Sequence, residues 1–300
     1  MKNYLRWLIL GGTLFFLLAA FKDHWREVVA VRIEPQGWLM LFFALLSTFA
    51  AHIWSAWVWT WILKAFHQPF GGATAIKIYL ITNLAKYLPG NIWHFYGRIS
   101  AVTKAGGSLE VASLSVLLEP LLMAAAALLI ALTSSSFGWL TTSQVGLQFL
   151  VLAIVLLGIN PHILNWGIRL LSRLKGQKTA TMEIKQYPLL PLLGELCFLL
   201  LRGTGFLFAV AALMPVNYYD IPQLLSVFSF AWLLGLIVPG APGGLGVFEA
   251  TAIASLDSEL FPPALVLTVV AFFRVVSLLA EASTAGLAYL MKEQNFIPKN

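Results

Sequence analysis

Two Pro-Gly pairs interrupt long apolar stretches of this chain, at Pro89-Gly90 and Pro239-Gly240. The second pair follows the first by 150 positions, which is half of the 300 residues. Proline removes a backbone donor and clashes with the preceding helical turn, while glycine adds conformational freedom. A lipid bilayer tolerates such a break only where the freed backbone groups are buried in protein or face a watery cavity. Matching breaks in two halves of a sequence predict a transporter-type site near the middle of a membrane.

The composition indicates that nearly all of the chain lies in a membrane. Hydrophobic residues make up 59% of the sequence and charged residues 11%, whereas soluble domains carry about 25% charged residues. The net charge of +6 does not indicate a nucleic-acid partner, because the lysines and arginines are concentrated in short loops between apolar spans. The single cysteine, Cys197, excludes an internal disulfide. We predict a single membrane domain over residues 1–300, with no appended catalytic domain.

Six apolar segments are long enough to cross a bilayer, since roughly 30 Å of hydrocarbon takes about 20 helical residues. We expect these spans at approximately 4–21, 37–63, 109–133, 145–164, 188–214 and 262–291. The first is interpreted as an uncleaved span, because Ala19-Ala20-Phe21-Lys22 is a poor signal-peptide cleavage site. The two interrupted regions, 72–103 and 222–256, each predict two short helices rather than one span.

The positive charges of the short loops predict the orientation of the chain. Five lysines and arginines fall in loop 165–187, which we therefore place in the cytoplasm. None falls in the loops that we place outside, at 134–143, 215–221 and 255–261. Both termini are then cytoplasmic. The interrupted region 222–256 begins and ends outside, and region 72–103 begins and ends in the cytoplasm, so both are predicted to be re-entrant hairpins from opposite faces.

The order of these elements repeats. Shifted by 150 positions, the span at 37–63 falls on 187–213, and a span is expected at 188–214. Each half, approximately 1–144 and 145–300, has the order span, span, hairpin, span. Three crossings per half would invert the second half relative to the first. The prediction is an all-α polytopic membrane protein with about six transmembrane spans plus two re-entrant helical hairpins in an inverted-topology repeat; chance similarity in a leucine-rich chain is the alternative.

Ionisable residues inside the continuous spans are the first candidate site residues. Each costs about 2.5–3.5 kcal/mol at the bilayer centre and therefore needs a partner or a cavity. Glu195 and Arg202 are seven positions apart, as are Arg274 and Glu281, so each couple shares one helix face. Both arginines fall near mid-membrane and both glutamates about two turns nearer the cytoplasm. This layering predicts a polar cavity open inward, with ion pairs that only join spans as the alternative.

The two breaks add further candidates. The turn from 239 to 246 is rich in glycine, and such a turn exposes backbone N–H groups that bind anions. Helix breaks are predicted at Pro89, Gly90, Pro239, Gly240 and Pro242. Arginine binds phosphate with two parallel hydrogen bonds, and we predict headgroup contacts from Lys86, Arg98, Arg202, Arg274, Gly243 and Gly244. Charge balance or proton coupling is predicted for Glu119, Glu195, Glu249 and Glu281.

Structural roles remain open for several of these residues. Lys86 before one break and Glu249 after the other also suit the dipoles of the helix ends where they lie. Asn91 suits a helix N-cap, and His52 is expected to hydrogen-bond a neighbouring helix. The sequence contains no metal-ligand spacing, phosphate-binding loop or nucleophile elbow. We therefore predict no enzyme activity, no cofactor and no metal.

Together, the break segments resemble the lysylphosphatidylglycerol synthase transmembrane-region family of flippase-like integral membrane proteins. The matching residues are Lys86-x-x-Pro89-Gly90 with Arg98, Pro239-x-x-Pro242-Gly243-Gly244-x-Gly246-x-x-Glu249, and Arg274 in the last span. The resemblance implies a cytoplasmic (inner) membrane protein of a prokaryote that moves amphiphilic lipids between leaflets, such as anionic, polyprenyl-linked or aminoacylated lipids. Some members are fused to an aminoacyl-transferase domain, and the activity of that domain is not expected of this chain.

Three functions follow from the sequence. The leading one is a lipid translocase, with Arg202 and Arg274 holding a phosphate and membrane lipids as partners. The second is a scaffold or regulator of a lipid-modifying enzyme or a glycosyltransferase of glycan assembly, which would dock on loop 165–187. The third is a secondary transporter of small solutes, for which the same inverted repeat would serve. No nucleic acid is expected as a partner.

Overall fold

The chain is all-α in the computed structural model, which describes residues 33–68, 72–88, 92–135, 142–174, 184–238, 244, 246–256 and 259–291, and none of these residues forms a strand. Its elements are α2 (Pro35–Ala65), α3 (Gly72–Asn83), η1 (Leu84–Tyr87), α4 (Trp93–Lys104), α5 (Leu109–Ser135), α6 (Thr142–Gly158), α7 (Pro161–Leu174), α8 (Leu189–Ala211), η2 (Tyr218–Asp220), α9 (Ile221–Ile237), α10 (Val247–Ser255) and α11 (Pro263–Leu290).

Five helical segments in the described part of the chain are long and apolar enough to cross a membrane. They are α2, α5, α8, η2 with α9, and α11. The protein is therefore a multi-pass α-helical membrane protein. The spans expected at 37–63, 109–133, 188–214 and 262–291 are confirmed as continuous helices. The span expected at 4–21 lies outside the described residues.

The span expected at 145–164 is bent rather than continuous, although its two helices together are long and apolar enough to cross a membrane as one broken span. α6 ends at Gly158, α7 begins at Pro161, and the two helices are bent by 62°. Glycine lowers the cost of ending a helix and proline suits the first position of a new one. The side chain of Asn160 accepts a hydrogen bond from the backbone N–H of His162 at 3.0 Å and thereby caps α7. The apolar run alone gave no sign of this bend, because hydropathy continues through it.

Each interrupted region forms two helices, but the prediction that both would be short holds only for the first region. α3 and α4 have 12 residues each, or about 18 Å of helix, which is shorter than the hydrocarbon layer. In the second region, α9 with η2 is long enough to cross by itself, whereas α10 has only 9 residues. The residues at the two tips, Pro89, Gly90, Asn91, Pro239, Gly240, Pro242 and Gly243, lie outside the part of the chain that the structure describes.

α2 and α8 form a closely packed antiparallel pair. The Ser47 hydroxyl donates to the Leu201 carbonyl at 2.7 Å. About two turns further along α2, the Trp54 indole donates to the Gly194 carbonyl at 2.8 Å. A Cβ on Gly194 would lie 2.6 Å from a methyl group of Val58. Small residues let transmembrane helices approach closely and pack without a gap. This pair therefore has a fixed register.

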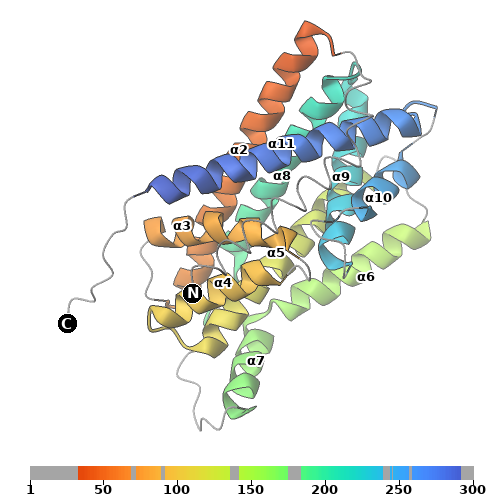
Figure 1. The fold of residues 1–300 in the computed structure, drawn as a ribbon. Helices are drawn as coiled ribbons and strands as arrows, with labels where there is room; N and C mark the ends of the chain where they lie inside the picture. Colours follow the sequence, from red (N-terminus) through yellow and green to blue (C-terminus); the bar gives the residue numbers. More distant parts are fainter. Residues whose placement is uncertain are drawn as a thin grey trace.

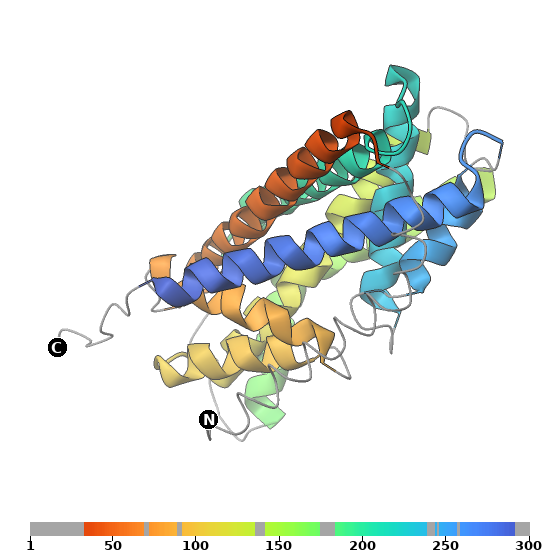
Figure 2. The same ribbon diagram turned by 45° about the horizontal axis from the view of Figure 1, so that its top comes forward.

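α11 and α5 pack on both members of this pair and connect it to the other helices. α11 crosses the face of the molecule over α2 (Figures 1 and 2), and it packs on α2, α3, α8 and α10. α5 packs on α4, α6, α8 and α9. Figure 1 shows α3 beside the C-terminal half of α11 and α10 beside its N-terminal half. The interrupted regions thus approach the centre of the bundle from its two ends.

Candidate functional site

A cavity of about 630 Å³ lies in the middle of the bundle. Its volume is within the range of about 300–1,000 Å³ that small-molecule sites occupy. Side chains from both interrupted regions and from α2, α5, α6, α8 and α11 line it, and most are apolar. The lining residues that carry charge are Lys86, Arg98, Glu119, Arg202, Arg274 and Glu281. The structure therefore brings most of the sequence-predicted site residues, together with Gly244, to one place.

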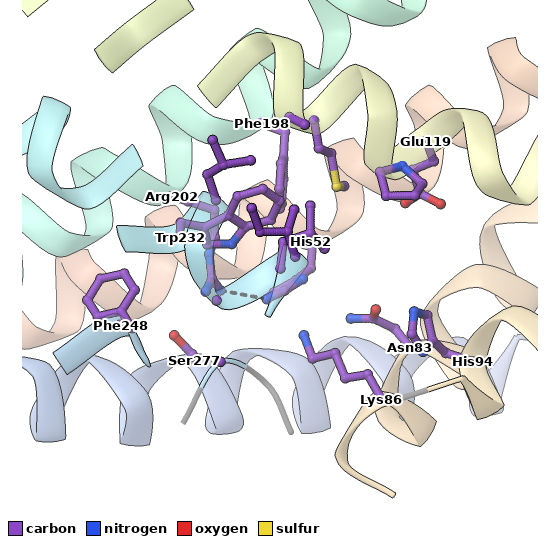
Figure 3. Close-up of a pocket in the computed structure, with 18 of the residues that line it drawn as sticks. His52, Asn83, Lys86, His94, Glu119, Phe198, Arg202, Trp232, Phe248 and Ser277 are labelled. Carbon is purple, nitrogen blue, oxygen red and sulfur yellow. Dashed lines mark hydrogen bonds between the residues drawn. The ribbon is translucent and has the colours of Figure 1, made fainter. Parts of the chain in front are cut away.

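A chain of polar contacts crosses the cavity from η1 to α8. Lys86 Nζ donates to Glu281 Oε1 at 2.7 Å, and the same oxygen lies 3.3 Å from His52 Nε2. Arg202 Nη1 lies 3.1 Å from that imidazole nitrogen. A guanidinium can only donate and a carboxylate can only accept, so this nitrogen bonds Arg202 when it is unprotonated and Glu281 when it carries a proton. Figure 3 shows Lys86 and Arg202 pointing into the same space from opposite sides. The expectation that His52 bonds a neighbouring helix is confirmed.

A second, more deeply buried network ties α4 to α5. Arg98 forms an ion pair with Glu119, and their residues are 1% and 3% exposed. Tyr79 donates to Glu119 Oε1 at 2.5 Å, and Ser55 Oγ lies 2.6 Å from the Tyr79 oxygen. The Arg98 guanidinium also stacks over the Tyr79 ring, 3.7 Å from its centroid. Glu119 is thus held by two donors from two other elements, and its charge is compensated.

The third network fixes the end of the glycine-rich turn. Arg274 forms an ion pair with Glu249 and donates from Nη2 to the Gly244 carbonyl at 3.1 Å. The Gly246 backbone N–H donates to Glu249 Oε2 at 2.8 Å. Gly244 and Gly246 have φ values of +73° and +80°, which favour glycine. A Cβ on Gly244 would lie 3.0 Å from the Cα of Gly235 on α9, so the two backbones touch.

The couples inferred from spacing along single helices do not pair with each other. Arg202 contacts His52 rather than Glu195, and Arg274 contacts Glu249 rather than Glu281. Partners come from different elements because residues seven apart on a helix lie about two turns apart along its axis. Only the rotation of each helix in the bundle decides which charges meet. A single sequence does not contain that rotation, so the partners were missed.

Arg202 is the one cavity cation without a carboxylate partner among the described residues. Four cations and two carboxylates line the cavity, and Glu249, paired to Arg274 behind the wall, adds a third carboxylate. Arg202 is 8% exposed, its Nε has no hydrogen-bond partner, and its guanidinium lies 5.2 Å from the centroid of the Phe273 ring. Among the described residues, the cavity therefore has one more cation than it has carboxylates to pair with it.

The cavity has an apolar mouth on one side. Its four most exposed lining residues are aliphatic and belong to α5, α6 and α9: Leu117, Leu121, Val151 and Ile237. α6 packs mainly on α5 and α7, at the edge of the bundle. Among the described residues, no charged side chain lies at this opening. Sequence reasoning missed the mouth because aliphatic residues of a span look alike whether they face lipid, protein or a cavity.

The class that fold and site define is a multi-pass α-helical membrane protein with a charged cavity at its centre. No family model and no curated protein matches the chain. The flippase-like resemblance of the break segments therefore stays a prediction from the motifs.

Proposed function

We propose that this protein moves an amphiphile with an anionic headgroup between the leaflets of a membrane. The observation that carries the proposal is Arg202 at the cavity, which has no carboxylate partner among the described residues. A buried charge without a counterion costs several kcal/mol, and a phosphate or carboxylate of a substrate would supply that counterion. Arginine suits this role because its planar fork donates two parallel hydrogen bonds to such a group.

The aliphatic mouth supports an amphiphile rather than a free solute as the substrate. A headgroup near Arg202 would leave its hydrocarbon chain room to pass between Leu121 on α5 and Ile237 on α9, both of which line the cavity. A soluble anion would gain nothing from an opening toward lipid, since its path would have to begin and end in water. The mouth thus favours lipid translocation over the transport of small solutes.

We also infer that the two halves form an inverted repeat. Four pairs of helix contacts support it, because the members of each pair are related by a shift of 150 positions. The pairs are α2 with α3 and α8 with α9, α2 with α11 and α8 with α5, α3 with α11 and α9 with α5, and α4 with α5 and α10 with α11. The antiparallel pair α2 and α8 would lie at the pseudo-twofold axis. His52 and Arg202, which are 150 positions apart, contact each other there.

Two ion pairs at matching places support the same inference. Arg98–Glu119 ties α4 to α5, and Glu249–Arg274 ties α10 to α11. The second helix of each interrupted region is thus joined by an ion pair to the helix that follows it. The arginine lies on the second helix of the interrupted region in the first half and on the following helix in the second half. Each half would in this way position one side of a shared passage for the headgroup.

Labelling of single cysteines from either side of the membrane tests this topology. In a Cys197→Ala background, cysteines at Asp220 and Glu259 are expected to react with an impermeant reagent from outside. Cysteines at Lys64 and Lys104 are expected to react from the cytoplasm, where we also place both termini, in the cytoplasmic membrane of a prokaryote. If positions 220 and 259 react from opposite sides, region 222–256 crosses the membrane and the inverted repeat is rejected.

Reconstitution in liposomes tests the function itself. We expect the purified protein to accelerate leaflet exchange of a fluorescent anionic phospholipid well above the rate of protein-free liposomes. A zwitterionic lipid with the same chains should exchange more slowly, because the excess cation of the cavity then has no net counter-charge. Uptake of a soluble phosphate ester without any lipid exchange would instead identify a small-solute transporter, and no exchange of any lipid would reject the proposal.

A further inference from the structure

Glu195 on α8 differs from every other carboxylate near the cavity. Its residue is 0% exposed, and neither of its side-chain oxygens has a hydrogen-bond partner among the described residues. The other three carboxylates each have a charged donor: Arg98 for Glu119, Arg274 for Glu249 and Lys86 for Glu281. Glu195 is not one of the residues that line the cavity.

The one cation that acts on Glu195, Arg98, already forms an ion pair with Glu119. The charged groups that act on it are Glu119 of α5 and Arg98 of α4, and the Tyr79 hydroxyl of α3 is also near. Other ionisable groups on the helices that pack on α8 are Glu110 of α5, His52 and Lys64 of α2, and Arg274 and Glu281 of α11. α9 contributes no ionisable side chain. Arg98 is committed to Glu119.

An ionised Glu195 would be expensive in this position. A buried carboxylate without donors costs several kcal/mol, and two carboxylates that share one cation do not both ionise readily. The neutral acid avoids both costs. Arg98 nevertheless offers a second contact, because its Nε has no partner while its Nη1 contacts Glu119. The guanidinium has a spare donor that an ionised Glu195 would need.

We propose that Glu195 is the proton-binding site of this cavity and shares its proton with Glu119 through the position of Arg98. In the described arrangement Glu195 is the protonated acid, and Arg98 compensates ionised Glu119. The proton passes from Glu195 to Glu119, Arg98 turns to the new Glu195 carboxylate, and Glu119 on the cavity wall then releases the proton into the cavity. The local charge stays constant in the transfer and falls by one on release.

The charge count links this proton to the anion, a step that rests on the proposed function. With Glu195 protonated, four cations face three carboxylates, and the site has one positive charge to offer an anionic headgroup. With Glu195 ionised, four cations face four carboxylates, and the site no longer has a net positive charge to attract the headgroup. A proton and an anion are therefore expected to bind together and to cross in the same direction, as binding linkage requires.

Infrared difference spectroscopy tests the protonation without reference to transport. We expect the carbonyl stretch of a protonated carboxylic acid in the wild-type protein, shifted in deuterium oxide and lost in Glu195→Gln. The control Glu259→Gln, on an exposed loop residue, should keep the band. Glutamine has the shape of the neutral acid, so Glu195→Gln should melt at the wild-type temperature. Absence of the band, or a large loss of stability in Glu195→Gln, would mean that Glu195 is ionised and would overturn the proposal.

A pH gradient across liposomes tests the coupling. For the wild type, labelled anionic lipid should accumulate in the leaflet on the alkaline side, because proton and lipid move together down the proton gradient. Glu195→Gln should still exchange lipid but distribute it equally. Equal accumulation by both proteins, or none by a wild type that does exchange lipid, rejects the coupling. A wild type that exchanges no lipid rejects the proposed function instead, and the infrared band then decides on the proton site alone.

Discussion

Replacing Arg202 with alanine is expected to slow the exchange of anionic lipid by roughly ten- to a hundredfold, because a hydrogen bond to a charged group contributes about 1.5–3 kcal/mol. The protein should still fold. Arg202 has no carboxylate partner among the described residues that its loss would leave unpaired, and its neighbour His52 also lies near Glu281. Leaflet exchange in liposomes and the melting temperature in detergent measure the two effects separately.

Two further variants make this result specific. Arg202→Lys keeps the charge but loses the planar fork, so an intermediate rate is expected. Lys104→Ala removes a cation from the exposed end of α4 and should leave the rate unchanged. The rate for a zwitterionic lipid should change less than the rate for an anionic one. An Arg202→Ala protein that exchanges anionic lipid at the wild-type rate would exclude Arg202 from headgroup binding.

Removing Arg98 is expected to have the largest effect on stability. Arg98→Met leaves the carboxyl of Glu119 buried without its cation, and breaking a buried pair on one side costs about 3–5 kcal/mol. The double variant Arg98→Met with Glu119→Gln should recover most of this loss, because glutamine is neutral and still accepts the hydrogen bond from Tyr79. Unfolding in detergent, analysed as a double-mutant cycle, measures the coupling.

A surface arginine provides the matched control for this cycle. Arg169 on α7 is exposed, and Arg169→Met should cost less than about 1 kcal/mol, since exposed charges contribute little. If Arg98→Met unfolded as easily as this control, the Arg98–Glu119 pair would not stabilise the bundle. A double variant no more stable than either single variant would assign the loss to packing of the Arg98 side chain against Tyr79.

The apolar runs were sufficient to predict four of the long helices. α2, α5, α8 and α11 begin and end within a few residues of the expected bounds, because about 20 apolar residues have no alternative to a helix in lipid. The bend between Gly158 and Pro161 was missed because hydropathy does not change there, although the sequence Gly-Ile-Asn-Pro carried the signal in its turn and capping residues.

The residues of the candidate site could be predicted from the sequence, but their ion-pair and hydrogen-bond partners could not. Ionisable residues in apolar segments are few, so Lys86, Arg98, Arg202 and Arg274 were all identified from the sequence. Which of them would be neutralised depends on helix rotation and on how the interrupted regions fold back into the bundle. The distinct position of Glu195 has the same origin: its spacing to Arg202 places both on one helix face, but it does not tell that the charged groups acting on Glu195 are Glu119 and Arg98.

The contact of Gly235 with Gly244 has a mechanical consequence. The two backbones meet with no side chain between them, so no change of rotamer at this point can separate α9 from the end of the turn. A methyl group added at Gly235 would lie 3.1 Å from the Gly244 Cα, and one added at Gly244 would lie 3.0 Å from the Gly235 Cα. Alanine at either position is therefore expected to push the two segments apart and to displace the carbonyl that Arg274 contacts.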